Sequence, residues 1–391
     1  MSQSSLTRRR FLKLSTALGA TLVLPSGCRS LLAQIDTLKP TPNAITRTSP
    51  LPTPASTPVV SSPIPTVAPT PAALPSPTAT LAPHLKLKAP SGGSKLGLHV
   101  VGGPHGGLDL FLLRCAVADH PVAVIKCVDD FEAAFKAKRL SDKTLTVGRV
   151  NAAWLSRKNE VDMQAWEPPE FTPQVEFHYT TAQEAAEKYY ELVLPTWKLN
   201  PPIDVWETFN EFSWHWGWQA DFYLRLMDLA EADGYRLGLW SPSTGNPPEE
   251  FYPEIARTCQ RAKAHGNHIL CLHEYGLDGL LKDAPRDLVT RYRQLYRYLE
   301  QEDAVIPLVI SEAGENGGGG FTGVEVFVND FAWYDRQLSQ DSYVIGCAAW
   351  TLGDWSGSSF AAALPALADY ITGQPAWPMT YLPLIEKNAA Q

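Results

Sequence analysis

Two glutamates in this sequence, Glu211 and Glu312, each stand at the end of an apolar run. The first run covers Ile203–Glu211 and the second covers Ile306–Glu312. Both runs have the length and composition of buried β-strands, so both carboxyl groups are expected at strand ends. Cleavage of a glycosidic bond requires one protonated and one ionised carboxyl group on either side of it. The pair therefore predicts chemistry on a sugar linkage.

Three other glutamates compete for these roles. Glu207 precedes Glu211 by four residues on the same strand face, so it should lie deeper and serve as hydrogen-bonded structure. Glu274 stands between two candidate site residues, and strand alternation points it away from them. Glu315 lies in a loop with four consecutive glycines, which would position a nucleophile poorly.

Four further polar side chains fall on the strands or at their ends. His273 and Tyr275 share one face of the strand Asn267–Tyr275, with a packed core histidine as the alternative for His273. Arg149 ends another strand and could bond an ionised glutamate and keep it charged. His99, on the first strand, could line a ligand site or simply pack in the core.

The tryptophans suggest a flat ligand. All 12 of them lie after residue 150. Trp350 ends the last predicted strand, and Trp214, Trp216 and Trp218 closely follow the first glutamate. Indole planes fit the C–H faces of pyranose rings, so these side chains predict a carbohydrate ligand. The alternative is that the three clustered indoles pack their loop onto the next helix.

Short apolar runs alternate with amphipathic segments from Ser94 onward. This alternation is typical of repeated βα units, and eight successive units predict an α/β fold, the (β/α)8 TIM barrel. An open doubly wound sheet is the alternative, but it rarely has eight parallel strands without a glycine-rich nucleotide loop. The loop Gly102–Gly107 lacks the Lys-Ser/Thr pair of a phosphate loop. The predicted strands are Lys95–Val101, Val122–Val128, Thr144–Asn151, Ile203–Glu211, Arg236–Ser241, Asn267–Tyr275, Ile306–Glu312 and Tyr343–Trp350.

In such barrels the functional side chains lie at the C-terminal ends of the strands. Here the sequence resembles the retaining glycoside hydrolases of clan A, which include cellulases, mannanases and β-1,3-glucanases. The resemblance covers strands four to eight by motif and strands one to three by pattern only. The residues that carry it are Asn210, Glu211, His273, Tyr275, Glu312 and Trp350.

The resemblance implies a role for each of these residues. Glu211, after its asparagine, would be the acid/base, and Glu312 would be the nucleophile. His273 and Tyr275 would support the nucleophile, and Trp350 would form the floor of the sugar site. No metal and no organic cofactor is expected.

The implied mechanism is a double displacement with retention of configuration. It needs carboxyl groups about 5–5.5 Å apart, whereas an inverting enzyme needs about 6.5–9.5 Å. Two alternatives stay open: a cell-surface barrel that binds glycan without cleaving it, and a transglycosylase that uses the same pair. Ser241-Pro242 at the end of strand five also resembles the β-1,3-glucanase branch, but the glycan and its linkage stay open.

The first 93 residues have the composition of an export signal and a tether. We expect a signal region at 1–36, a linker at 37–93 and a catalytic domain at 94–391. Thr7–Lys13 precedes a short apolar segment and resembles a twin-arginine signal. Pro25–Cys28 resembles a lipobox, with Pro25 in place of the usual aliphatic residue. The linker is rich in Pro, Thr and Ser, which predicts an extended disordered segment.

These features predict a protein that is extracellular or held at the cell surface. Cys28 would be the attachment point of a lipid, and membrane contact is expected only through that anchor. The formal net charge is −8, without a long run of Lys or Arg, which disfavours nucleic acid as a partner. We expect a monomer whose partner is a carbohydrate substrate.

The five cysteines of the barrel region contain no C-x-x-C pair, so a zinc site of that kind is not indicated. Three of them lie inside apolar runs, and buried thiols are therefore expected. A Cys115–Cys127 or a Cys259–Cys271 disulfide is the open alternative.

Overall fold

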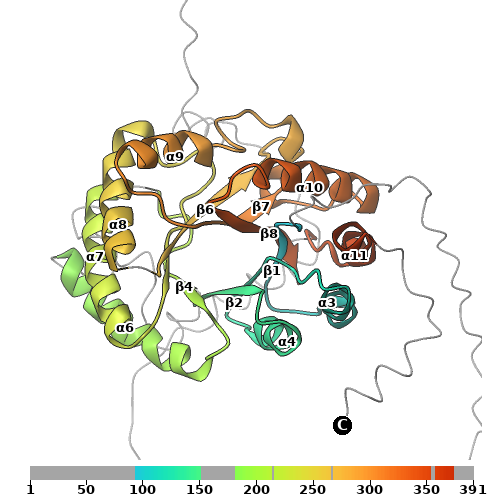
Figure 1. Cartoon of the computed structure of the whole chain (residues 1–391), viewed down its shortest axis with the longest axis horizontal. Helices are drawn as coiled ribbons and strands as arrows, with labels where there is room; N and C mark the ends of the chain where they lie inside the picture. Colours follow the sequence, from blue (N-terminus) through green and yellow to red (C-terminus); the bar gives the residue numbers. More distant parts are fainter. Residues whose placement is uncertain (1–92, 151–180, 214, 266, 354–356, 374–391) are drawn as a thin grey trace, which may run out of the picture. The chain divides into compact units, whose positions relative to one another are not determined.

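Eight parallel strands form a closed barrel in the computed structural model (Figure 1). Each strand pairs with its neighbour in the chain, and β8 pairs with β1 to close the ring. The structure describes residues 93–150, 181–213, 215–265, 267–353 and 357–373. The strands are β1 (Leu96–Val100), β2 (Val124–Val128), β3 (Leu145–Arg149), β4 (Val205–Glu207), β5 (Leu237–Trp240), β6 (Ile269–Tyr275), β7 (Leu308–Gly314) and β8 (Val344–Leu352).

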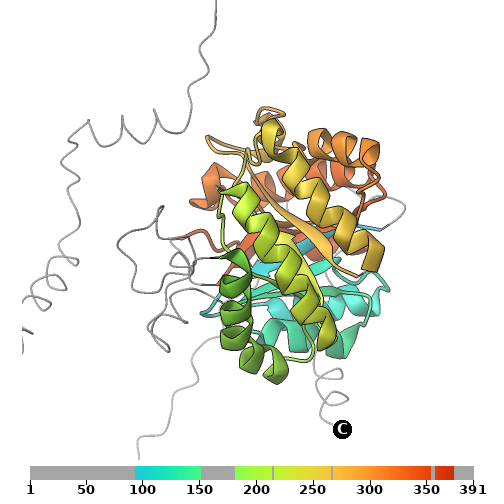
Figure 2. The ribbon, with the colours of Figure 1, turned by 90° about the vertical axis from the view of Figure 1, so that its left-hand side faces the viewer.

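Helices cover the outside of this barrel. Figure 2 shows α6, α7 and α8 packed side by side along one flank. The helices are α3 (Leu108–Val117), α4 (Glu132–Leu140), α6 (Ala182–Leu199), α7 (Trp216–Ala232), α8 (Tyr252–His265), α9 (Tyr292–Gln301), α10 (Val324–Leu338) and α11 (Leu364–Thr372). Closure of the ring and this alternation confirm the predicted (β/α)8 barrel and exclude the open sheet.

Strand alternation divides the hydrophobic core into two layers. One set of strand side chains packs outward against the helices, and a smaller set fills the inside of the barrel, with Val124, Val147, Val205, Ile269 and Val309 among its members. Because side chains two positions apart share a strand face, the next inward residues are Lys126 in β2, Arg149 in β3 and Glu207 in β4. The apolar barrel interior therefore continues into a layer of charged side chains.

A missing side chain in β3 makes room for a large one in β4. A Cβ at Gly148 would lie 2.6 Å from a ring carbon of Trp206, so only glycine fits there. Trp206 in turn stacks on Trp197 of α6, with ring centroids 5.3 Å apart. This packing fixes the position of Arg149, the next residue in β3.

The two strands predicted to end in the glutamates end at different places than the sequence pattern indicated. β4 stops at Glu207 and not at Glu211, and β7 continues past Glu312 to Gly314. After β4 the backbone of Glu211 enters the left-handed region with a φ of 55°. The Glu211 amide donates to the carbonyl of Ser241 at 3.1 Å. Glu211 therefore lies on a loop held against the end of β5.

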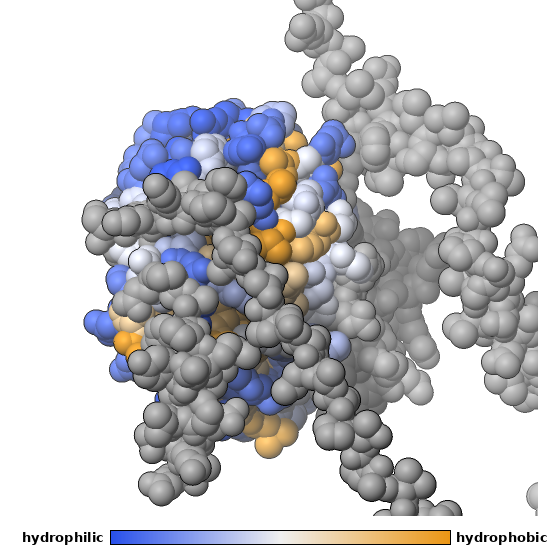
Figure 3. Space-filling model, turned by 90° about the vertical axis from the view of Figure 1, so that its right-hand side faces the viewer, coloured by the Kyte–Doolittle hydropathy of each residue, from blue (hydrophilic) through white to orange (hydrophobic). Residues whose placement is uncertain are grey.

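The five cysteines among the described residues are all buried and unpaired, so neither alternative disulfide forms. No helix in the described part of the chain has both the length and the apolar character of a membrane span. The face in Figure 3 carries small hydrophobic groups among hydrophilic residues, which is ordinary for a protein surface. The signal, the linker, Cys28 and Trp214 lie outside the described residues.

Candidate active site

The register between β6 and β7 brings the first two candidate side chains together. His273 pairs directly with Glu312, just after an irregularity in the ladder at Leu272. The Nδ1 atom of His273 lies 3.4 Å from Oε2 of Glu312 and 3.2 Å from Oε1 of Glu211. The imidazole therefore contacts both carboxyl groups, although one lies on the loop after β4 and the other in β7.

The carboxylate of Glu312 is surrounded by donors from three strands. Its Oε1 accepts hydrogen bonds from Nζ of Lys126 at 3.0 Å and from the guanidinium of Arg149 at 3.1 Å. Its Oε2 accepts from the hydroxyl of Tyr275 at 2.9 Å. The predicted partners Arg149 and Tyr275 are thus both in contact with Glu312.

These contacts determine the charge of Glu312. Burial alone would raise the pKa of the carboxyl group, but the nearby His273, Lys126 and Arg149 outweigh it and hold the pKa well below its usual range. Glu312 is therefore ionised across the neutral range, as a carboxylate nucleophile must be.

His99 approaches the same carboxylate from β1. Its Nε2 lies 3.4 Å from Oε1 of Glu312, and the residue is fully buried. Burial lowers the pKa of His99 to about 4, so the ring is neutral near pH 7. Its ring also lies against Trp350, with centroids 4.5 Å apart. His99 therefore both packs in the core and borders the site.

Glu211 differs from Glu312 in its exposure. Its side chain is 33% exposed, against 5% for Glu312. Oxygen atoms of the two carboxyl groups lie within 4.8 Å of each other. Asn210, the residue before it, is exposed at the same loop. One ionised, buried carboxylate thus faces a second carboxyl group that can exchange protons with solvent.

Lys126 is a site residue that belongs to none of the sequence motifs. It is fully buried, and its Nζ lies 2.7 Å from Oε2 of Glu207 as well as 3.0 Å from Glu312. A signal was present in the sequence, because a lysine in the middle of an apolar strand needs buried partners of opposite charge.

Glu207 has the structural role that its depth in the barrel suggested. It is fully buried and accepts a hydrogen bond from the Ser241 hydroxyl at 2.9 Å. Burial would raise the pKa of Glu207, but the nearby Lys126 and Arg149 outweigh burial and lower the pKa to about 2. Glu207 is therefore an ionised partner for two cations and has no opening to a substrate.

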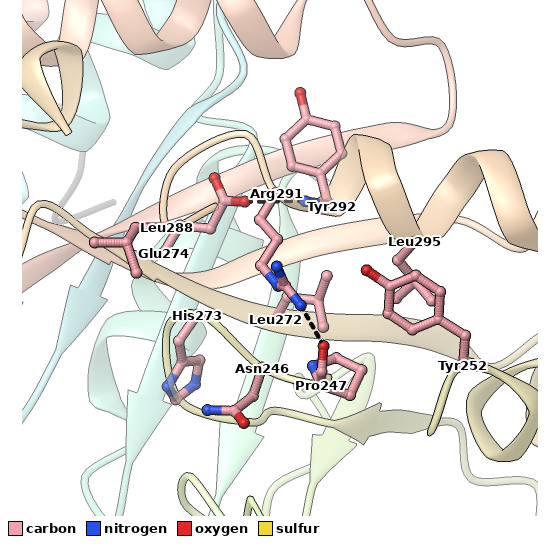
Figure 4. A pocket seen from close by; sticks show the side chains of 11 residues that line it. Asn246, Pro247, Tyr252, Leu272, His273, Glu274, Leu288, Arg291, Tyr292 and Leu295 are labelled. Carbon is pink, nitrogen blue, oxygen red and sulfur yellow. Dashed lines mark hydrogen bonds between the residues drawn. The ribbon is translucent and has the colours of Figure 1, made fainter. Parts of the chain in front are cut away.

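Glu274 lies on the opposite face of β6 from His273, as Figure 4 shows. It accepts hydrogen bonds from the backbone amides of Thr290 and Tyr292 and from the Tyr334 hydroxyl. Alternation therefore placed it correctly, away from the site.

The last rival, Glu315, binds the amide and hydroxyl of Thr322. It thereby holds its own loop together and contacts neither carboxyl group by any hydrogen bond found among the described residues.

A small pocket lies beside His273, between β6 and the segment that leads into α9 (Figure 4). Arg291 spans this pocket and donates to the carbonyl of Pro247 at 2.6 Å. The enclosed space is of the order of a single water molecule and cannot hold a sugar ring. The pocket is therefore not the substrate site.

The tryptophans divide between surface and core. Trp350 is half-buried beside His99, and its Nε1 donates to the carbonyl of Gly318 at 3.1 Å. Trp216, predicted as a possible sugar contact, is only 3% exposed and packs between Trp240 and Phe251. Its indole is thus part of the core, as the alternative interpretation held, because Trp216 is the first residue on the buried face of α7.

One metal-like arrangement coincides with the site. Donor atoms of Glu211, His273 and Glu312 lie within 4.8 Å of one another. However, Lys126 and Arg149 already contact the Glu312 carboxylate. A divalent cation would add further positive charge at short range. The electrostatics therefore disfavour a metal and fit acid/base and nucleophilic chemistry.

No protein-family model matches this chain, and no curated protein matches it by sequence. Among solved structures, a GH128 endo-β-1,3-glucanase from Amycolatopsis mediterranei in complex with laminarihexaose is 13% identical, with a TM-score of 0.41; the match covers 71% of this chain and 100% of that chain. A glucosidase from Croceicoccus marinus is 11% identical, with a TM-score of 0.38, over 74% of this chain and 66% of that chain.

The carboxyl transferase domain of Rhizobium etli pyruvate carboxylase is also similar, at 11% identity and a TM-score of 0.33, over 76% of this chain and 53% of that chain. Proteins of different activities thus match at comparable levels. Identities and TM-scores this low carry no argument about activity. What this chain can do chemically follows from its own site.

Proposed function

We propose that this protein is a retaining glycoside hydrolase that cleaves β-glycosidic bonds, with Glu211 as acid/base and Glu312 as nucleophile. The observation that carries this proposal is the separation of less than 4.8 Å between oxygens of the two carboxyl groups. An approach this close supports the about 5–5.5 Å spacing of direct attack over the about 6.5–9.5 Å gap of an inverting enzyme.

In the first step an oxygen of Glu312 forms a bond with the anomeric carbon while the bond to the leaving oxygen breaks. The proton of the Glu211 carboxylic acid moves to that leaving oxygen, which departs as an alcohol. The negative charge thereby passes from Glu312 to Glu211. The solvent-accessible third of the Glu211 side chain suits a group that must reach the leaving oxygen in this step and a water molecule in the next.

In the second step the Glu211 carboxylate takes a proton from water, and the water oxygen bonds to the anomeric carbon. The bond between sugar and Glu312 breaks, which restores the ionised Glu312 and the protonated Glu211. A sugar hydroxyl in place of water would give transglycosylation by the same two residues. Inversion occurs at each step, so the product keeps the configuration of the substrate.

The surrounding residues support a sugar as the substrate. Trp350 presents a half-buried indole beside His99, and indole faces stack on pyranose rings. We assign Trp350 as the floor of the subsite next to Glu312. Asn210, exposed next to Glu211, is assigned to a hydroxyl of the same sugar.

We further propose that the enzyme is exported by the twin-arginine route and held at the cell surface through a lipid on Cys28. Arg8 and Arg9 stand in the signal-like segment Thr7–Lys13. Replacement of both arginines by lysine should keep the protein inside the cell, and Cys28→Ser should release it from membranes. Fractionation of cells that express each variant measures both effects.

Hydrolysis of a panel of β-glucans and β-mannans by the full chain tests the enzymatic proposal. Glu211→Gln and Glu312→Ala should each lower kcat by about 10⁴-fold or more, because each removes a group that takes part in bond breaking. Glu315→Gln is a matched control, since that carboxylate holds its own loop through Thr322, and it should keep its activity.

Rescue by azide and the stereochemistry of the product distinguish the roles of the two glutamates. With Glu312→Ala, azide should attack the open anomeric face and give a glycosyl azide of inverted configuration; with Glu211→Gln it should give one of retained configuration. Proton NMR of the first wild-type product should show the substrate's anomer. An inverted product, or full activity in either variant, would reject the assignment.

A further inference from the structure

The charged layer inside the barrel contains a lysine that takes no part in the proposed mechanism. Lys126 is fully buried in β2. Its Nζ lies 3.0 Å from Oε1 of Glu312 and 2.7 Å from Oε2 of Glu207. No backbone carbonyl was found as an acceptor for this ammonium group among the described residues, so both of its close partners are carboxylates. Lys126 thus bridges the deep glutamate and the catalytic one.

Polar side chains from four strands, β1, β2, β3 and β6, face Glu312. Lys126 and Arg149 approach from β2 and β3, and His99 from β1. On the other side, His273 and Tyr275 of β6 face its second oxygen. Nδ1 of His273 also lies 3.2 Å from Oε1 of Glu211, and this imidazole links the two carboxyl groups.

The two oxygens of Glu312 therefore have different environments. Oε1 accepts hydrogen bonds from two cations, Lys126 and Arg149. Oε2 accepts one from the neutral hydroxyl of Tyr275, and it faces His273, which contacts Glu211. An oxygen that holds two cations has its lone pairs engaged, which leaves Oε2 as the atom free to attack.

We propose that Lys126 is a positioning residue of the nucleophile: it fixes Oε1 of Glu312 and directs Oε2 toward the anomeric carbon, with Glu207 as its counter-charge. This inference rests on the proposed function. Glu207 keeps the ammonium group at the height of Glu312, because its own carboxylate is held by the Ser241 hydroxyl at 2.9 Å. A lysine that only neutralised Glu207 would not need to reach Glu312.

Three variants of the full chain distinguish positioning from simple charge balance. Lys126→Met removes the cation and keeps the length of the side chain. Lys126→Met with Glu207→Gln removes both charges, so it should fold even where the single variant leaves Glu207 buried with too little positive charge. Glu207→Gln alone leaves Lys126 with Glu312 as its one charged partner of the two, and it is the matched control.

The first measurement needs no turnover. Carbon NMR of ¹³C-labelled glutamate carboxyl groups, with Glu312 assigned by Glu312→Gln, follows the ionisation of this side chain. In both variants that lack Lys126, the pKa of Glu312 should rise by about 1–3 pH units, the usual effect of losing a close opposite charge. In Glu207→Gln it should not rise.

The second measurement is kcat against pH. Both variants without Lys126 should lose about 10²-fold in kcat with a much smaller change in KM, and their acidic limbs should move to higher pH. If the double variant regains the wild-type pKa of Glu312 and the wild-type kcat, Lys126 only balances Glu207 and the proposal is wrong. If the wild type cleaves no glycan, the proposed function fails, while the NMR titration still decides whether Lys126 holds Glu312 in its charged form.

Discussion

Glu274 allows a stability prediction that can be worked out from the structure. Its side chain is 2% exposed, and its carboxyl group meets two backbone amides and the Tyr334 hydroxyl. Burial raises its pKa from 4.5 to about 7, because the three donors offset only part of the cost of burying a charge. Glu274→Gln keeps the shape and removes the titration.

The sign follows from the direction of this pKa. A carboxyl group whose pKa is higher in the folded state stabilises the fold fully below its unfolded value of 4.5, and this contribution is lost as the pH rises to about 7. At about 1.4 kcal/mol per pH unit, the free energy of unfolding of the wild type should fall by about 3 kcal/mol relative to Glu274→Gln over this window. Above pH 7 the difference should stay constant.

Urea unfolding of both proteins at half-unit pH steps from 4.5 to 8 measures this difference. Subtracting the two curves cancels every other titrating group that the substitution leaves alone. Glu300→Gln, at an exposed position of α9, is the control and should run parallel to the wild type. Parallel curves for Glu274→Gln as well would show that the three donors fully compensate burial, and the reasoning would be refuted.

Three further substitutions test the sugar floor, the nucleophile and the core. Trp350→Ala should raise KM about tenfold, the equivalent of about 1.4 kcal/mol, with little change in melting temperature; an unchanged KM would remove the indole from the subsite. Tyr275→Phe takes away the hydroxyl that donates to Glu312 and should lower kcat about tenfold while KM holds, which steady-state kinetics on the best glycan will show or contradict. Gly148→Ala puts a Cβ 2.6 Å from Trp206 and should cost about 1–3 kcal/mol in urea unfolding; wild-type stability would mean that the ring can shift.

The barrel was predictable because its strands are apolar on both faces and its helices on one. The end of β4 was not. Phe209 and Phe212 extend the apolar run past Glu207, yet they pack on each other and, through Phe209, on Phe222 of the outer layer, and not in the ladder. Hydrophobicity continued there after the strand's hydrogen bonds had ended, so the pattern placed the strand end four residues too late.

The carboxyl pair was predictable, whereas its electrostatic support was predictable only in part. Arg149 stood at a strand end and was found, but Lys126 lay between apolar neighbours in mid-strand. The partners of Lys126 are distant in sequence, and only the closed ring brings the three charges together. Trp216 was mistaken for a surface residue, although its spacing from Ala220 and Tyr223 marks the buried face of α7.

The barrel closes only when its last strand, β8, is present to pair with β1. A chain that stops before Val344 exposes two unpaired strand edges, along β1 and β7, and such edges recruit other chains. Closure joins segments about 250 residues apart, and contacts at that distance form late in folding. The same closed ring brings Lys126 of β2 and Arg149 of β3 to the carboxylate of Glu312 in β7, so a chain that lacks β8 should also lack the contacts that keep this carboxylate ionised and oriented.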